Sequence, residues 1–234
     1  MDQAVIAPAL EISMPTPSLL RYRFASSIDD DPGRCVSVRG DHDLNPGMVV
    51  ASELREAAVL VPLVVRPEGF TVIFTKRTPH LAAHGGQVSF PGGQIEYEDL
   101  DAEAVALRET EEEIGLSRAH VEPIGRLDTY ITRTGFLVTP VVGLVYPPFA
   151  LTPDPEEVAE VFEVPLTTIL DPHMPLRDTY PVRGIDRLFY VFPYGEHRIW
   201  GATAGMLVNL RDVLGVRPAL PAATRVVTET PDTL

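Results

Sequence analysis

The order of strand-like and helical segments constrains the fold most, because apolar runs of strand length stand on both sides of one strong helix. Residues 58–65 and 70–77 are β-rich runs separated by a turn that contains Gly69, a pattern that predicts a hairpin. Helices are predicted over residues 101–114 and 202–214. Further strands are predicted over residues 87–90, 121–130, 136–145 and 188–192. This order predicts an α+β or mixed α/β fold in layers.

The length and the proline distribution suggest one main domain with two appendages. The chain has 234 residues, which fits a single large domain. Residues 1–54 are predicted to be a partly ordered N-terminal extension, closed by a short helix over residues 53–58. Residues 55–215 form the predicted domain, and residues 216–234 form a C-terminal tail.

Composition excludes several classes of protein. The formal net charge is −14, so the surface repels phosphate backbones and a general nucleic-acid binder is not expected. The longest apolar stretch covers nine residues, too few to span a bilayer. The single cysteine, Cys35, excludes an intrachain disulfide. A secretory or transit signal requires basic residues near the N-terminus, and the first twenty residues contain no Lys or Arg. We therefore expect a cytoplasmic protein.

Capping signals delimit the predicted central helix. Asp101 suits the N-cap, where its carboxylate can accept hydrogen bonds from free backbone N–H groups. Leu100 and Val105 stand at positions that form a hydrophobic staple. Gly115 fits the position after the last turn, where a left-handed conformation is needed.

Helical periodicity divides this segment into two predicted faces. The predicted buried stripe consists of Ala104, Leu107, Thr110 and Ile114. The opposite face carries the carboxylates of Glu109, Glu112 and Glu113.

The three carboxylates are unfavourable in an isolated helix. Like charges one turn apart repel each other, and the C-terminal end of the helix dipole also disfavours anions. A divalent cation such as Mg²⁺ or Mn²⁺ would make the cluster favourable, since both prefer oxygen ligands. Arg108 could hold the acids in place through charge-assisted hydrogen bonds. A solvated acidic face is the alternative that the cluster alone leaves open.

A glycine loop precedes the helix and completes a recognisable pattern. Phe90-Pro91-Gly92-Gly93 stands eight residues before Asp101, and residues 108–116 read Arg-Glu-Thr-Glu-Glu-Glu-Ile-Gly-Leu. This combination resembles the box of the Nudix hydrolase family, with Thr110 in an apolar slot. The first half departs from the box, because Asp99 replaces a glutamate and eight residues rather than seven separate it from Arg108.

The departure resembles one subgroup, the coenzyme A diphosphatases. Residues 75–81 and 84–93 are similar to the upstream motif of that subgroup, and residues 138–143 and 199–204 to downstream stretches. The resemblance covers residues 55–215 and implies an α/β/α sandwich around a mixed β-sheet.

The resemblance also implies a chemistry. Coenzyme A or a derivative would be hydrolysed at its diphosphate, giving 3′,5′-ADP and 4′-phosphopantetheine or its acyl form. Glu109, Glu112 and Glu113 would hold Mg²⁺ or Mn²⁺, and Arg108 would orient these acids. Gly92 and Gly93 would contribute backbone geometry to substrate binding.

Other assignments stay open at this level. The general base could be Glu112, Glu157 or Glu160, or the two later acids could belong to a solvated turn. Arg77 is a candidate phosphate contact or an ordinary surface arginine. Trp200 could stack on adenine, although a core position is the stronger expectation. Two loop histidines, His80 and His84, show no metal-binding spacing.

Alternative functions follow from the same residues. ADP-ribose or another nucleotide sugar is the rival substrate, and a non-catalytic nucleotide-sensing module is a more distant alternative. A plain acidic cation-binding protein would leave the glycine loop unexplained. The predicted partner is a small nucleotide, without nucleic acid or membrane, and a homodimer is left open.

Overall fold

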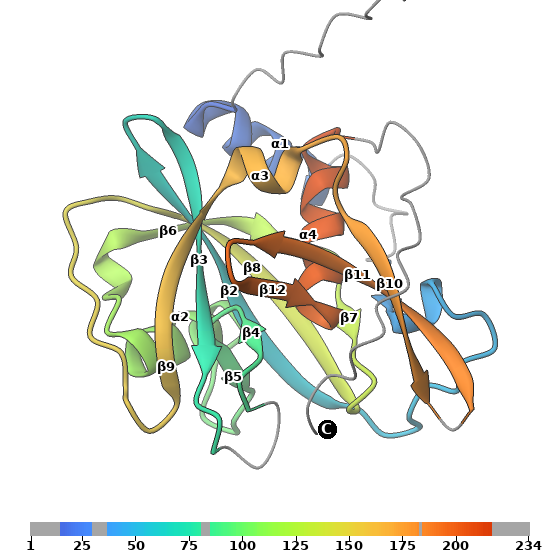
Figure 1. Cartoon of the computed structure of the whole chain (residues 1–234). Coiled ribbons are helices and arrows are strands. Elements are labelled where there is room, and N and C mark those ends of the chain that lie inside the picture. The colour runs from blue at the N-terminus through green and yellow to red at the C-terminus, as the bar shows by residue number, and fades with distance from the viewer. Residues whose placement is uncertain (1–14, 30–36, 81–84, 183, 217–234) are drawn as a thin grey trace, which may run out of the picture.

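A computed structural model describes residues 15–29, 37–80, 85–182 and 184–216 (Figure 1). Its α-helices are α1 (Pro17–Asp29), α2 (Ala102–Ile114), α3 (Leu166–Leu170) and α4 (Gly201–Val213), and its 3-10 turns are η1 (Asp41–Asp43) and η2 (Arg118–His120). Its strands are β1 (Arg39–Gly40), β2 (Arg55–Arg66), β3 (Gly69–Arg77), β4 (Val88–Ser89), β5 (Gly92–Gln94), β6 (Val121–Arg126), β7 (Tyr130–Ile131), β8 (Phe136–Val145), β9 (Val158–Pro165), β10 (Leu176–Val182), β11 (Ile185–Tyr194) and β12 (His197–Trp200).

A nine-stranded mixed sheet forms the centre of the fold. Its main path runs β1-β7-β8-β2-β3-β4, while β5 pairs with β2, β6 with β8 and β9 with β3. The long β2–β8 pair is parallel and the β2–β3 hairpin is antiparallel. Strands β10, β11 and β12 form a separate antiparallel sheet of three strands. The predicted mixed sheet is therefore confirmed.

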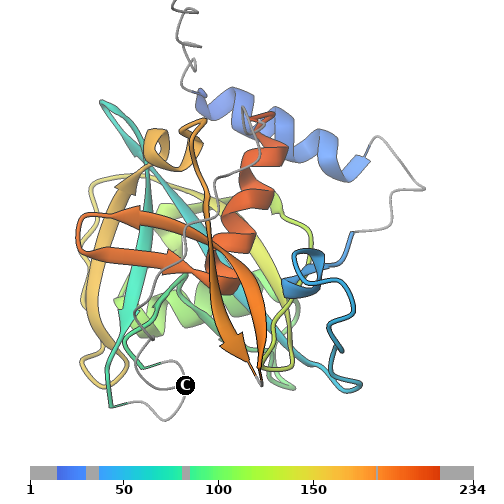
Figure 2. The same cartoon turned by 45° about the vertical axis from the view of Figure 1, so that its right-hand side comes forward.

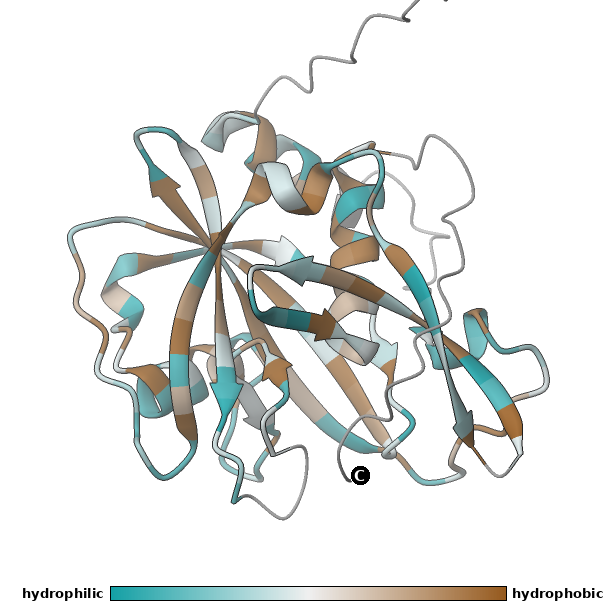
Figure 3. Cartoon of the chain, viewed as in Figure 1, coloured by the Kyte–Doolittle hydropathy of each residue, from teal (hydrophilic) through white to brown (hydrophobic). Residues whose placement is uncertain are grey.

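The two faces of the large sheet bury different layers. In Figures 1 and 2, α2 lies behind the sheet, whereas the small sheet and α4 lie in front of it. Side chains from alternate positions of β2 serve both faces: Leu60 packs with Val105 of α2, and Val61 belongs to the main core with Leu207 of α4. Figure 3 shows this centre as apolar strands between more polar ends. Burial on both faces explains why β2 reads as a continuous apolar run.

The described residues before β2 contribute to the same core. Leu20 and Phe24 of α1 are fully buried, and α1 packs against β6 and α4. Further along, β1 pairs in parallel with β7 through Arg39 and Tyr130. Cys35 and residues 217–234 lie outside the described residues.

Several predicted boundaries require correction. The helix predicted over residues 53–58 is wrong, because β2 begins at Arg55 and pairs there with Phe136 of β8. The strand predicted over residues 121–130 divides into β6 and β7, with residues 127–129 between them. Elements α1, β9 and β10 were not predicted, because their apolar residues follow neither the helical nor the strand period clearly. No helix in the described part of the chain is long and apolar enough to cross a membrane.

Candidate active site

The predicted caps of α2 are present, but the hydrophobic staple is not. The Asp101 carboxylate accepts a hydrogen bond from the Ala104 N–H at 2.9 Å, and Gly115 adopts a left-handed conformation with φ of 69°. Leu100 is 93% exposed, so the predicted staple with the buried Val105 is wrong. The helix begins and ends where its sequence predicts, and its first turn carries the Asp101 cap without the predicted staple.

The buried face of α2 differs from the predicted stripe. Thr110 and Ile114 are fully buried as predicted, but Ala104 and Leu107 are only half-buried. Glu113, predicted on the face opposite the buried stripe, is 5% exposed. The helix is rotated in this way because β5 and the glycine loop cover the side that carries Glu109 and Glu113. The buried α2 residues are Ala102, Val105, Ala106, Thr110, Glu113 and Ile114.

Both glycines of the loop approach the carboxylates closely. The Gly92 N–H donates a hydrogen bond to Glu113 Oε2 at 3.3 Å. A Cβ atom at Gly93 would come within 2.3 Å of the Glu109 carboxyl carbon. Gly92 has φ of 153°, and a side chain there would collide with the backbone of Ala58. Glycine is therefore required at position 92 by the backbone of β2, and at position 93 its missing side chain leaves the Glu109 carboxylate in its place.

Arg108 organises the outer acids. Its guanidinium donates to both oxygens of Asp99 at 3.1 and 3.0 Å, and its Nη1 donates to Glu109 at 2.9 Å and Glu112 at 3.0 Å. These hydrogen bonds, which Arg108 donates and the Asp99 carboxylate accepts, raise the pKa of Arg108 and lower the pKa of Asp99. Asp99, the residue at which the box departs from its family, thus holds the arginine in a two-point clamp.

Arg77 and Glu157 complete the cluster from outside α2. Arg77, at the end of β3, places Nη1 3.6 Å from Glu113 Oε1 and Nη2 3.9 Å from Glu157 Oε2. Glu157 also acts electrostatically on Glu109 and Glu113, because its charge raises the pKa of both. One arginine therefore links the buried acid of the helix to an acid from the turn before β9.

Burial dominates the electrostatics of the inner acids. Loss of water raises the pKa of Glu113 to about 8, although Arg77 and the Gly92 N–H oppose this change. Burial also raises the pKa of Glu109, partly offset by Arg108. Carboxyl groups in such surroundings favour any cation that can replace the bound proton.

The carboxylate ligands fit a hard divalent cation whose remaining coordination positions are open to substrate. Carboxylate oxygens of Glu109 and Glu113 face the glycine loop, and such oxygens are the ligands that Mg²⁺ and Mn²⁺ prefer. Within the described ranges, no three Asp, Glu, His or Cys side chains lie close enough together to hold a metal ion by themselves. Mg²⁺ commonly uses one or two carboxylates and leaves its other positions to water and substrate phosphates. Glu112 lies at the edge of this set, with its side chain 59% exposed.

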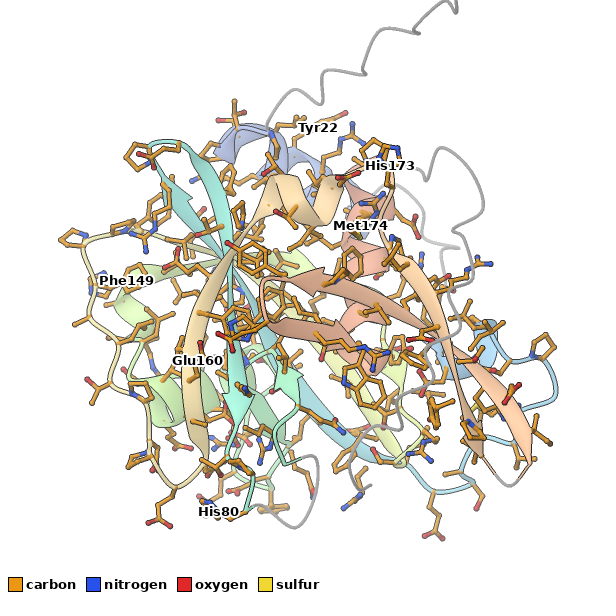
Figure 4. The ribbon with its side chains drawn as sticks, viewed as in Figure 1. Tyr22, His80, Phe149, Glu160, His173 and Met174 are labelled. Atoms are coloured by element: carbon orange, nitrogen blue, oxygen red, sulfur yellow. The ribbon has the colours of Figure 1, made fainter. Side chains whose placement is uncertain are left out.

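Glu160 lies apart from this cluster. On β9, Val158 and Val161 pack on the α2 side, whereas Glu160 and Phe162 face the small sheet. His197 of β12 stacks on Phe162 with ring centroids 3.8 Å apart, and its Nε2 is 3.4 Å from Glu160. Figure 4 labels Glu160 on β9. Of the two later acids, the structure brings Glu157 to the cluster.

The remaining candidates occupy other surroundings. Trp200 makes edge contacts with Phe189 and Tyr180 in the small sheet, so it belongs to an aromatic cluster there. His80 is exposed just after β3 (Figure 4), and His84 lies outside the described residues.

Comparison with family models identifies a NUDIX domain over residues 54–183. The chain belongs to the Nudix family. A curated relative from Escherichia coli K12, the uncharacterized Nudix hydrolase NudL, is 42% identical over 166 residues, which cover 70% of this chain and 85% of NudL. The NudL of Escherichia coli O7:K1 is 41% identical over the same length. This Nudix protein is accordingly a hydrolase of a family that acts on nucleoside diphosphate-linked compounds and generally uses divalent metal ions.

Solved Nudix structures are similar to this chain at low sequence identity. The Nudix hydrolase RenU from M. smegmatis has a TM-score of 0.48 at 19% identity and matches 75% of this chain and 99% of its own. A C. elegans Ap4A hydrolase in a binary complex has a TM-score of 0.42 at 17% identity, over 47% of this chain and 80% of its own.

Proposed function

We propose that this Nudix hydrolase cleaves the diphosphate of coenzyme A or of an acyl derivative, giving 3′,5′-ADP and 4′-phosphopantetheine or its acyl form. One observation carries the proposal. The upstream motif that resembles coenzyme A diphosphatases (residues 75–81 and 84–93) meets one of the downstream stretches (residues 199–204) beside the glycine loop, where the Thr203 hydroxyl donates to the Val88 carbonyl at 3.1 Å. Residues of the upstream motif, Arg77 and Gly92, also contact the buried Glu113.

The proposed metal ligands are Glu109, Glu113 and, at the exposed edge, Glu112. Bound Mg²⁺ or Mn²⁺ would neutralise the diphosphate and lower the pKa of a bound water. Arg108 and Asp99 keep Glu109 and Glu112 aimed at this locus, since each carboxylate receives a hydrogen bond of 2.9 to 3.0 Å from the arginine. The two glycines keep side chains out of it, which leaves room for phosphate oxygens.

Arg77 and Glu157 have complementary proposed roles. Arg77 is 26% exposed, so its guanidinium can reach a substrate phosphate from beside Glu113. Glu157 is 49% exposed and lies on the other side of Arg77, where its carboxylate can accept a proton from water. We assign the general base to Glu157 in preference to Glu160, whose carboxylate is directed at His197 on the other face of the sheet.

The proposed reaction is an in-line hydrolysis. The water oxygen bonds to one phosphorus while the bond from that phosphorus to the bridging oxygen breaks. The bridging oxygen leaves on the other phosphate, and Glu157 takes a proton from the water. Both products end as phosphate monoesters. Positioning and charge stabilisation supply most of the catalysis in phosphoryl transfer.

A product assay tests the proposal. Coenzyme A, ADP-ribose and NADH are incubated separately with the protein and with Mg²⁺ or Mn²⁺, and the products are identified by mass. We expect 3′,5′-ADP from coenzyme A at the highest kcat/KM. A preference for ADP-ribose or NADH would refute the substrate assignment, and binding of all three without turnover would support a sensing module. We also propose a cytoplasmic location and a small-molecule partner; light scattering would test for a homodimer.

A further inference from the structure

Thr78 fixes the turn that carries Glu157. Its backbone N–H donates to the Glu157 carbonyl at 2.9 Å, and its hydroxyl donates to the Glu156 carbonyl at 3.0 Å. Thr78 directly follows β3 and is 5% exposed. Leaving a buried hydroxyl without its hydrogen-bond partner destabilises the folded protein, so these two hydrogen bonds constrain both the end of β3 and the turn. Two consecutive carbonyls of the turn are therefore held by one residue.

Asp154 holds the same turn from the side of α2. Its N–H donates to the Glu113 carbonyl at 2.9 Å, and its carbonyl accepts from the N–H groups of Glu157 at 3.1 Å and Val158 at 2.8 Å. Its side chain accepts from the Glu156 N–H at 2.9 Å. The turn is thus attached to the end of the metal-site helix through Asp154 and to the end of β3 through Thr78.

A register shift between β3 and β9 lies next to this attachment. Lys76 pairs with Glu160, but the next residue, Arg77, pairs with Val158, so β9 contains one extra residue at this point. Such irregularities redirect side chains at the end of a strand. They occur here beside Arg77, whose guanidinium lies between the carboxylates of Glu113 and Glu157. Thr78 is the residue that fixes Glu157 immediately beyond the shift.

We propose that Thr78 is a positioning residue that acts on catalysis through Glu157. This inference rests on the proposed function, in which Glu157 accepts the proton from water. The Thr78 hydroxyl faces a backbone carbonyl, so its own role requires no contact with substrate. Loss of the hydroxyl frees the Glu156 carbonyl and lets the Glu157 carboxylate leave its place beside Arg77.

Steady-state kinetics of paired variants test the proposal. Thr78→Val keeps the size and backbone of threonine but removes the hydroxyl, and Thr78→Ser restores it. We expect Thr78→Val to lower kcat by about 10- to 100-fold, as a displacement near 1 Å can do, with KM changed less than about threefold. Thr78→Ser should stay within about threefold of wild type in kcat. If Thr78→Val does not fold, Thr78→Ala also removes the hydroxyl and places no methyl group where the hydroxyl was.

A double-mutant cycle separates this role from general stabilisation. If Thr78 acts through Glu157, Thr78→Val should add less than about twofold to the kcat loss of Glu157→Gln. Hydrogen exchange of residues 152–160, measured without divalent cation, should rise in Thr78→Val and remain at the wild-type level in Thr71→Val. Thr71 is a matched control, because its hydroxyl also donates to an acceptor across from its own segment, but it lies on β3 and its acceptor is Glu163 of β9, away from the turn.

The outcomes are distinct. Wild-type kcat in Thr78→Val, or a full and independent loss on top of Glu157→Gln, would overturn the Thr78 proposal while leaving the function in place. Wild-type activity in Glu157→Gln would remove the residue through which Thr78 is said to act, and would also overturn it. Failure of the wild-type protein to hydrolyse any of the three nucleotides would instead refute the proposed function. In that case, unchanged hydrogen exchange of residues 152–160 in Thr78→Val would still overturn the proposal that Thr78 fixes the turn.

Discussion

Replacing Glu113 by glutamine should separate stability from activity in a pH-dependent way. The carboxyl group is 5% exposed and its pKa rises from 4.5 to about 8 in the folded protein. Between these pH values the folded state holds a proton that the unfolded state has released. The stabilising contribution of this group is therefore complete below pH 4.5 and falls as the pH rises toward 8.

The magnitude follows from the size of the pKa change. Each pH unit between the unfolded-state pKa of 4.5 and the folded-state pKa of about 8 corresponds to about 1.4 kcal/mol. The interval from pH 4.5 to pH 7.5 therefore amounts to about 4 kcal/mol. Glutamine has the same size and no titration. The free energy of unfolding of Glu113→Gln, relative to wild type, should thus increase by about 2 to 4 kcal/mol between pH 4.5 and pH 7.5. For a chain of this length that is roughly 4 to 16 °C in Tm.

The assay is thermal and denaturant unfolding at several pH values in EDTA, with Glu112→Gln as a control on the exposed edge of the same helix. The control should follow the pH dependence of wild type. Added Mg²⁺ should stabilise wild type more than Glu113→Gln, because only the folded wild type offers the buried carboxylate. Hydrolysis by Glu113→Gln should be nearly abolished at saturating Mg²⁺. A difference in unfolding free energy that stays constant from pH 4.5 to 7.5 would refute the burial argument, and full activity would refute the metal role.

Three further changes test other parts of the structure. Gly93→Ala places a Cβ against the Glu109 carboxyl group, so we expect at least a tenfold loss of kcat/KM in kinetic assays; unchanged kinetics would contradict the close approach. Glu160→Gln should keep kcat within about twofold of wild type, since its contact with His197 lies away from the reacting groups. Phe24→Ala should lower the free energy of unfolding by about 3 to 5 kcal/mol in urea titrations, as expected for a fully buried ring; a change below 1 kcal/mol would show that α1 is not part of the core.

Local sequence rules were sufficient for the central helix and the strands around it. Asp101 and Gly115 mark the ends of α2 because capping depends on the few neighbouring residues that lack helical hydrogen bonds. The hairpin of β2 and β3 follows from two apolar runs and a short turn. The spacing of Arg108 and its following acids was enough to predict membership of the Nudix family, which the domain match confirms.

The sequence did not determine which side of the helix would be buried. Helical periodicity gives relative angles between side chains, but the buried side depends on what packs there. Here β5 and its two glycines cover the side of Glu109 and Glu113, so Glu113 is buried and Glu109 half-buried, while Ala104 and Leu107 are only half-buried. A buried carboxylate is unfavourable by itself, and only a partner outside the local pattern can stabilise it.

Long-range pairing decided which later acid joins the site. Glu157 and Glu160 are three residues apart and equivalent by composition, but a register shift opposite Arg77 places one beside Glu113 and the other beside His197. Likewise, nothing near Phe24 in sequence indicates that α1 packs on β6, about 100 residues away. Residues 101–115 thus determined the helix and its chemistry through short-range geometry, whereas the tertiary structure decided the surroundings of each acid, because strand register and burial depend on residues distant in sequence.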